Sequence, residues 1–211
     1  MDLINSFSQE KFTAICDLLA ASDPDLLVVI TQHGYPPMWI RRFNFETLIH
    51  IILEQQVSLA SAMSALRKLQ EKLGDITPTA LLSLTDMELK ACYFSRQKTA
   101  YARHLAQSII SGDLQLQKLS NAPDETVRAE LKKIKGIGDW TSDVFLMMAL
   151  QRADIFPIGD IALLNSIKIV KNLPKQTSKE EILKIAALWK PYRTIAAFIL
   201  WHAYLSKRNK G

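Results

Sequence analysis

Two features of the chain carry residue types that could act on a phosphate-containing substrate. The stretch 131–142 reads Leu-Lys-Lys-Ile-Lys-Gly-Ile-Gly-Asp-Trp-Thr-Ser, with two glycines one residue apart between two apolar, helix-period segments. A helix that begins after such a turn has unpaired N–H groups in its first turn, and these bind phosphate oxygens. A lone carboxylate follows in the stretch 156–160, Phe-Pro-Ile-Gly-Asp. Together they predict a phosphate-binding turn and an acid that could act on the molecule carrying that phosphate.

The Gly-Ile-Gly turn has a DNA-binding interpretation and a purely structural one. Gly136 and Gly138 can take positive φ and leave room for a sugar–phosphate, while Ile137 would be buried and Lys135 adds charge. Such a turn grips the DNA backbone without reading its sequence. A plain helical corner that uses glycine as a C-cap explains the same residues. Spacing alone leaves both interpretations open.

Asp160 also has two interpretations, and they are compatible. It precedes the helical pattern Ile-Ala-Leu-Leu, so it could be a helix N-cap. An ionised carboxylate at the mouth of a pocket could also stabilise a sugar oxocarbenium ion as a base leaves, and orient the attacking water. A residue at a helix start is held rigidly, which suits the chemical role as well.

The elements that must position these residues are helices. Apolar residues recur every three or four positions along most of the chain, as at Leu59, Met63, Leu66 and Leu69. The stretches 85–88 and 178–181 have capping-box spacing. Helices are expected from about 123 to 134 and from 139 to about 150, on either side of the glycine turn. The sequence therefore predicts an all-α fold of about ten helices.

Bulk composition narrows the function classes. The 211 residues are 48% hydrophobic, and the net charge of +5 favours an anionic partner such as nucleic acid. Cys16 and Cys92 exclude a disulfide framework, and the four histidines show no metal-ligand spacing. The longest apolar runs, 144–150 and 195–201, are too short to span a bilayer. We expect a protein without membrane association, in the nucleoid-containing cytoplasm of a prokaryote or the nucleus of a eukaryote.

Five segments in order resemble the helix-hairpin-helix superfamily of DNA glycosylases, in its alkylation-repair (3-methyladenine, type II) branch. The segments lie at 23–34, 48–60, 94–101, 131–142 and 189–201. The resemblance implies a two-lobed all-α fold with the active site in the cleft between the lobes, and flipping of the target base out of the duplex. We assign residues 1–42 together with 154–211 to one lobe, and 43–153 to a central lobe carrying the hairpin.

The resemblance also implies roles for single residues. Asp160 falls at the catalytic aspartate, and Gln56 at the position that enters the gap left by the flipped base. The hairpin glycines grip phosphate, and backbone carbonyls near Ile134 and Gly136 could hold a monovalent cation; no metal is expected on side chains. The implied DNA-binding residues are Gln56, Lys135, Gly136, Ile137, Gly138 and Thr141.

The base pocket implied by the resemblance is aromatic. Trp140 and Trp201 would line it, and their indole faces suit a cationic base such as 3-methyladenine or 7-methylguanine. Tyr35 and Trp39 could form another wall, although surface or core roles explain them equally well. For Trp201 the alternative is core packing against Trp189 and Phe198.

Trp140 stands where bifunctional relatives have the lysine that forms a Schiff base. We therefore expect a monofunctional DNA glycosylase that excises alkylated purines in base excision repair, acting as a monomer on damaged double-stranded DNA without a cofactor. Two alternatives are a lesion-binding helix-hairpin-helix protein with little or no excision, and a bifunctional glycosylase/AP lyase.

Overall fold

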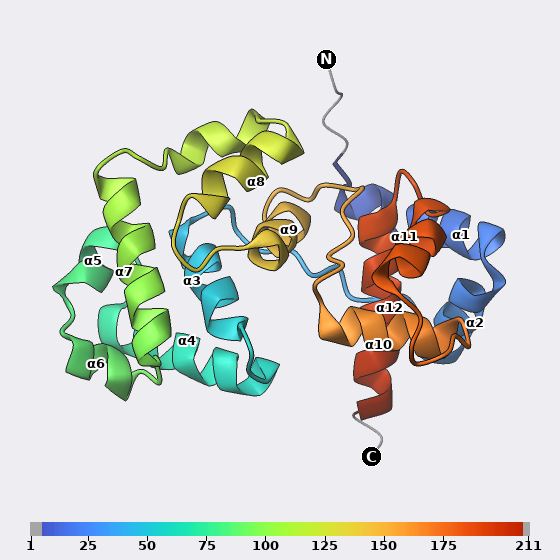
Figure 1. Ribbon diagram of the computed structural model, residues 1–211, viewed down its shortest axis with the longest axis horizontal. Helices are drawn as coiled ribbons and strands as arrows, with labels where there is room; N and C mark the ends of the chain where they lie inside the picture. The colour runs from blue at the N-terminus through green and yellow to red at the C-terminus, as the bar shows by residue number, and fades with distance from the viewer. Residues whose placement is uncertain (1–5, 209–211) are drawn as a thin grey trace. The chain divides into compact units, whose positions relative to one another are not determined.

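The computed structural model describes residues 6–208, which form twelve α-helices and one 3-10 helix (Figure 1). Within that range there is no strand, and an isolated bridge joins Ser6 to Arg152. The predicted all-α class is confirmed, with more helices than the ten expected. None of the described helices combines the length and apolar character that a bilayer span requires.

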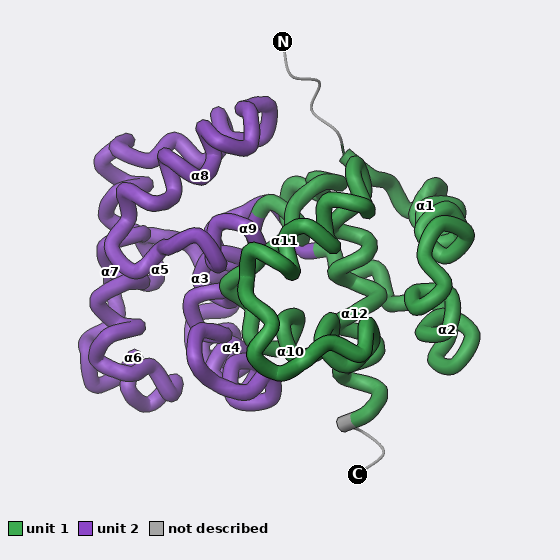
Figure 2. The backbone as a smooth tube through the Cα atoms, turned by 45° about the vertical axis from the view of Figure 1, so that its right-hand side comes forward, with its two compact units in different colours: residues 1, 3–40, 146–211 green, residues 2, 41–145 purple. Residues whose placement is uncertain are grey.

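The described residues divide into two compact units (Figure 2). Unit 1 takes the residues through 40 and those from 146 onward, and unit 2 takes 41–145. The chain passes from unit 2 back to unit 1 between residues 145 and 146, inside α9 (Asp139–Met148). That helix therefore contributes residues to both units.

Unit 1 is built around its last helix. It contains α1 (Gln9–Ser22), α2 (Pro24–His33), α10 (Ile161–Val170), α11 (Lys179–Ala187) and α12 (Arg193–Arg208). Helix α12 packs against α1, α2 and α10. Every residue from 195 to 200 is fully buried, as expected for a helix that is apolar on all sides. The central position of α12 fixes the side chains that project from it.

Unit 2 is built around α3 (Phe45–Glu54) and α7 (Arg96–Ile110). Helix α3 packs against α4 (Leu59–Leu73) and α7, while α7 also packs against α5 (Pro78–Ser83) and α6 (Asp86–Ala91). The 3-10 helix (Leu116–Asn121) and α8 (Asp124–Lys132) lead into α9. Leu48, Ile49, Ile51 and Ile52 of α3 are fully buried, so α3 forms the core of this unit.

Several helix starts form as their sequences predict. Thr85 with Glu88, and Ser178 with Glu181, make reciprocal capping boxes at the starts of α6 and α11. Ser8 is the N-cap of α1 but its side chain makes no capping hydrogen bond. The helices beside the glycine turn are each shorter by two residues than predicted at their C-terminal ends, because α8 ends at Lys132 and α9 at Met148.

A buried carboxylate joins three elements of unit 1. Asp23 caps α2 by accepting the N–H groups of Asp25 and Leu26. It also accepts from Lys171 Nζ at 2.6 Å and from Trp189 Nε1 at 2.8 Å. Burial alone would raise the pKa of Asp23, but these hydrogen bonds outweigh it and lower the pKa below the ordinary 3.8.

Removal of this carboxylate is expected to destabilise the protein. Asp23→Ala leaves the Lys171 ammonium and the Trp189 N–H without their buried acceptor, so the free energy of unfolding should fall by about 3 kcal/mol. Asp25→Ala is the matched control, because Asp25 meets the same lysine but its side chain is 49% exposed. Its loss should stay below about 1 kcal/mol. Denaturant unfolding measures both, and equal losses would contradict the role given to Asp23.

Lowering the pH should remove the stabilisation that the Asp23 carboxylate provides, because its protonation removes the negative charge. A carboxyl group whose folded pKa is lowered stabilises the fold above its unfolded pKa, and this stability is lost as the pH falls through the folded pKa. Unfolding measured from neutral pH to below 3.8 should therefore show a steeper loss for the wild type than for Asp23→Asn.

Candidate functional site

The glycine turn lies between α8 and α9 and is anchored by apolar residues. Leu131, Ile134 and Ile137 are buried, and the Ile137 N–H donates to the Ile134 carbonyl at 3.0 Å. Gly136 has a φ of +90°, whereas Gly138 keeps a negative φ. The prediction of positive φ is therefore right for Gly136 and wrong for Gly138, which is exposed at the start of α9.

Helix α7 lies directly beneath this turn. A Cβ atom placed on Gly136 would lie 2.1 Å from Cγ of Tyr101, so the backbone rests on the tyrosine ring. Three residues along α7, His104 Nδ1 accepts the Lys135 N–H at 3.0 Å. The requirement for glycine at 136 thus comes from close backbone approach as well as from φ.

A glutamine outside the predicted set ties the turn to α3. Gln55 Nε2 donates to the Gly136 carbonyl at 2.9 Å and to Thr141 Oγ1 at 3.0 Å. Thr141 is only 2% exposed, so its hydroxyl supports the turn from inside. The neighbouring Gln56, in the connection between α3 and α4, is exposed and has a φ of +57°. The Gln-Gln pair was visible in the sequence, but only the fold separates the anchor from the exposed residue.

The two glutamines make a matched pair for mutation. Gln55→Leu removes both hydrogen bonds and leaves the Gly136 carbonyl without this donor. The free energy of unfolding should therefore fall by about 2 kcal/mol. Gln56→Leu changes an exposed side chain and should stay within about 0.5 kcal/mol of the wild type. Thermal or denaturant unfolding of both variants is the measurement. A Gln55→Leu protein as stable as Gln56→Leu would show that the two bonds contribute nothing.

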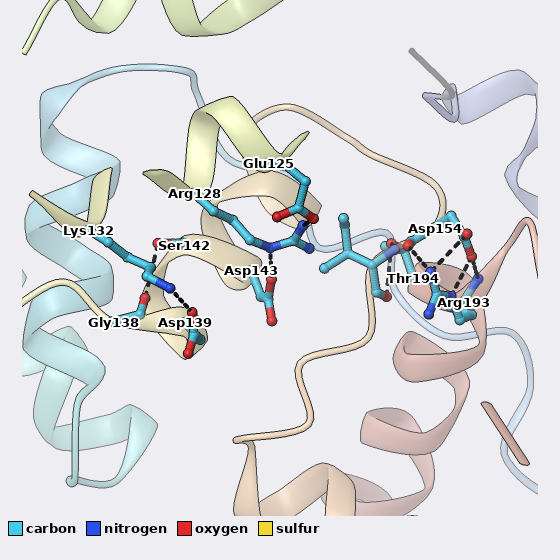
Figure 3. A network of polar contacts seen from close by, with 11 residues as sticks. Glu125, Arg128, Lys132, Gly138, Asp139, Ser142, Asp143, Asp154, Arg193 and Thr194 are labelled. Atoms are coloured by element: carbon cyan, nitrogen blue, oxygen red, sulfur yellow. Dashed lines mark hydrogen bonds and ion pairs between the residues drawn. The ribbon is translucent and has the colours of Figure 1, made fainter. Parts of the chain in front are cut away.

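Two of the lysines around the turn are paired with neighbouring acids, and Figure 3 shows the pair of Lys132 with Asp139. Lys132 pairs with Asp139, and Lys133 with Glu130. The positive charge of Lys132 and Lys133 therefore adds less to phosphate attraction than two unpaired lysines would.

A second ion pair locks α8 to α9 within the same unit. Arg128 Nε donates to Asp143 at 2.8 Å (Figure 3). Burial raises the pKa of Asp143 despite the nearby guanidinium. The residue before Asp143 adds a further bond, since Ser142 Oγ donates to the Gly138 carbonyl, one turn back along the chain, at 3.0 Å. These contacts hold the first turn of α9 in place, and with it the half-buried Trp140.

Asp160 lies in unit 1 and is the N-cap of α10. Its Oδ1 accepts the Leu163 N–H at 2.7 Å, which confirms the predicted cap. The same oxygen accepts Trp201 Nε1 at 3.1 Å. Two N–H donors on one oxygen fix the orientation of the carboxylate. The cap and the indole together position this half-buried acid.

The segment that leads to Asp160 is fastened to the start of α12. Thr194 Oγ1 donates to the Arg152 carbonyl at 2.6 Å and accepts the Ile155 N–H at 3.0 Å. Arg193 binds Asp154 through both carboxylate oxygens, at 2.6 and 2.9 Å (Figure 3). Helix α12 also carries Trp201. The same helix therefore positions the segment that precedes Asp160 and the indole that donates to its carboxylate.

Two of the four predicted pocket aromatics come together in unit 1. Trp201 stacks on Phe198 with centroids 5.8 Å apart, and Trp39 meets Trp201 edge-on at 6.3 Å. The alternative prediction placed Trp201 against Trp189 and Phe198. It is right for Phe198, whereas Trp189 packs on Phe156 instead. Tyr35 is 46% exposed and its hydroxyl donates to Asp17 at 2.7 Å. Trp140 belongs to unit 2.

The carbonyls near which a monovalent cation was expected already take part in the turn. The Ile134 carbonyl accepts the Ile137 N–H, and the Gly136 carbonyl accepts Gln55. A carbonyl has two lone pairs, so each can still contact a cation. Among residues 6–208, no group of three or more His, Cys, Asp or Glu side chains is arranged to hold a metal.

Known proteins match both the sequence and the fold. The chain is 34% identical to a DNA-3-methyladenine glycosylase of Bacillus subtilis over 74% of its own length and 56% of that protein. It is 30% identical to DNA-3-methyladenine glycosylase 1 of Schizosaccharomyces pombe over 74% of this chain and 71% of that one. The solved structure of the S. pombe 3-methyladenine DNA glycosylase with abasic DNA aligns with a TM-score of 0.83 and 27% identity, covering 89% of this chain and 95% of that chain.

The chain spans little more than half the length of the B. subtilis relative. The family model for "HhH-GPD superfamily base excision DNA repair protein", named for its helix-hairpin-helix, matches residues 49–191, more than half of the chain. That range contains both the glycine turn and Asp160. The resemblance found in the sequence is confirmed: the chain belongs to the HhH-GPD superfamily of base excision DNA repair proteins.

Proposed function

We propose that this protein is a monofunctional DNA glycosylase, of the 3-methyladenine type II class, that excises alkylated purines in base excision repair. The observation that carries the proposal is the Asp160 carboxylate, which Leu163 and Trp201 hold beside the aromatic group of Trp39, Phe198 and Trp201. The names of the relatives, DNA-3-methyladenine glycosylases, support the same activity.

The chemistry divides between carboxylate and aromatic rings. As the bond between C1′ and the purine nitrogen breaks, its electron pair leaves with the base and positive charge develops on the sugar. The Asp160 carboxylate stabilises that charge and orients the water that adds to C1′. A purine nucleotide methylated at N3 of adenine or N7 of guanine carries a positive charge, so the electron-rich faces of Trp140, Trp201 and Trp39 favour it over a neutral base. Tyr35 is the most exposed aromatic of the proposed set.

The hairpin supplies DNA affinity that does not depend on sequence. The backbone around Gly136, Ile137 and Gly138 binds phosphate, Lys135 adds charge, and the Thr141 hydroxyl braces the turn. Gln56 enters the space left by the flipped base. Double-stranded DNA with damaged bases is the proposed partner, bound by a monomer in the compartment that holds the genome.

Trp140 is the residue that makes the proposed enzyme monofunctional. Tryptophan has no amine to form a Schiff base with the sugar, so the reaction should stop at an abasic site. Borohydride treatment of the protein with damaged DNA should therefore leave no covalent adduct. A trapped adduct would instead identify a bifunctional glycosylase/AP lyase.

Base release from methylated duplex DNA tests the activity itself. We expect release of 3-methyladenine and 7-methylguanine, with DNA binding measured in parallel. Binding without release, across methylated, etheno and deaminated purines, would favour the alternative of a lesion-binding protein.

A further inference from the structure

An ion pair lies at the C-terminal end of α3, directly before Gln55 and Gln56. Glu54 is the last residue of α3, and Arg41 binds both of its carboxylate oxygens, through Nη1 at 2.9 Å and through Nη2 at 2.6 Å. The side chain of Glu54 is 7% exposed and that of Arg41 is 19% exposed. Two parallel N–H···O bonds fix the direction of a carboxylate as well as its place, so this pair is rigid.

The position of Glu54 is unfavourable for the helix itself. The C-terminal end of a helix carries a partial negative charge, which favours a cation and repels an acid, yet α3 has no basic residue in its last turn. His50 Nε2 lies 3.5 Å from Glu54 Oε1, but burial and the nearby Arg41 lower the pKa of His50 below its ordinary 6.5. At neutral pH, Arg41 is therefore the cation that balances Glu54, and local helix energetics do not explain an acid at this place.

Three contacts fix the end of α3, and each comes from a different part of unit 2. Arg41, at which the chain enters unit 2, holds Glu54. Lys98 of α7 donates to the Leu53 carbonyl at 2.6 Å, and Gln55 donates to the hairpin. Three consecutive residues, 53 to 55, are therefore each held by a separate partner.

Gln56 is the first residue after this fixed segment. Its φ of +57° costs energy for a residue with a side chain, and such a conformation persists where the surrounding structure fixes it. On its other side Ser58 caps α4 by accepting the Ser61 N–H. The direction in which the exposed Gln56 projects is therefore determined by the residues that flank it.

We propose that Arg41 and Glu54 are positioning residues for base flipping, whose ion pair fixes the end of α3 so that Gln56 points into the gap left by the flipped base. This inference rests on the proposed function, which gives Gln56 that place. Loss of the pair should impair the step that Gln56 performs and leave the affinity of the hairpin for the DNA backbone unchanged.

Two duplexes separate these effects. An undamaged duplex reports backbone binding, whereas a duplex with an abasic-site analogue offers a gap that Gln56 can fill. In Glu54→Gln the preference for the abasic duplex and the single-turnover excision of 7-methylguanine should each fall about tenfold, with unchanged affinity for the undamaged duplex. Glu71→Gln is the matched control, because it breaks the exposed pair of Lys68 and Glu71 on α4 and should keep both properties.

A second measurement tests whether the effect passes through Gln56. In a Gln56→Ala background, Glu54→Gln should reduce the preference for the abasic duplex no further, because the residue that it positions has been removed. A merely structural role would add the same loss in both backgrounds, and that result would overturn the inference.

Stability is separated from positioning by a double variant. Glu54→Gln leaves the Arg41 guanidinium without its charged partner, whereas Arg41→Met with Glu54→Leu leaves no unpaired charge and should melt near the wild type. The double variant still lacks the directional bonds, so it should show the same loss of preference. Full preference in the double variant, or equal weakening of Glu54→Gln on both duplexes, would overturn the inference and leave the glycosylase intact. A wild type that releases no base and binds both duplexes equally would overturn the proposed function as well.

Discussion

Asp160→Asn is expected to abolish most base release while leaving the fold intact. The asparagine keeps an oxygen for the Leu163 N–H and the Trp201 indole, and asparagine is as good an N-cap as aspartate. What it lacks is the negative charge that stabilises the developing sugar cation. Loss of one such electrostatic contribution slows an enzyme by about 10²- to 10³-fold.

Single-turnover release of 7-methylguanine, with DNA affinity and melting temperature measured on the same samples, is the assay. Asp160→Ala is the companion variant, since it removes the cap as well as the charge. It should lose about 1 kcal/mol of stability in addition to the activity. If Asp160→Asn releases the base at the wild-type rate, Asp160 has no catalytic role and serves only as the N-cap of α10.

Local signals in the sequence were enough to predict the helices and the residues at their starts. Thr85 with Glu88, Ser178 with Glu181, and Asp160 cap helices as their spacing indicated, because a capping bond spans only three residues. The burial of Ile137 was predictable from a local signal as well, because a single large apolar side chain stands between two glycines.

Contacts between distant segments could not be predicted in this way. Gln55 reaches a carbonyl 81 residues away, and nothing in the Gln-Gln pair says which glutamine turns inward. The ring of Tyr101 beneath Gly136 is a second case, since it explains why one glycine is required and Gly138 is not. The indole bond from Trp201 to Asp160 likewise depends on how α12 packs in unit 1.

Gly136→Ala should be among the most destabilising single substitutions in unit 2. The new methyl group would overlap the Tyr101 ring, at 2.1 Å from Cγ, and the residue would also have to hold a φ of +90°. Overpacking and the left-handed backbone together should cost about 3 kcal/mol or more, which lowers the melting temperature of a chain of this size by about 10 °C. Thermal unfolding followed by circular dichroism measures the change.

Gly138→Ala is the matched control, two residues along the same hairpin. An added Cβ there meets nothing within 4 Å and the φ is not positive, so its stability should match the wild type. Any loss of DNA affinity in Gly138→Ala then reports contact with the phosphate backbone rather than a damaged fold.

The clash itself can be tested by removing the ring. In the double variant Tyr101→Ala, Gly136→Ala the added methyl group has room. The free energy of unfolding of the double variant should therefore fall by about 2 kcal/mol less than the sum of the losses in the two single variants. Additive losses would show that the positive φ, and not the tyrosine, demands glycine at 136. If the losses are not additive, the hairpin holds its shape through a residue of α7, and substitutions at Tyr101 should then weaken DNA binding although Tyr101 itself makes no contact with the DNA.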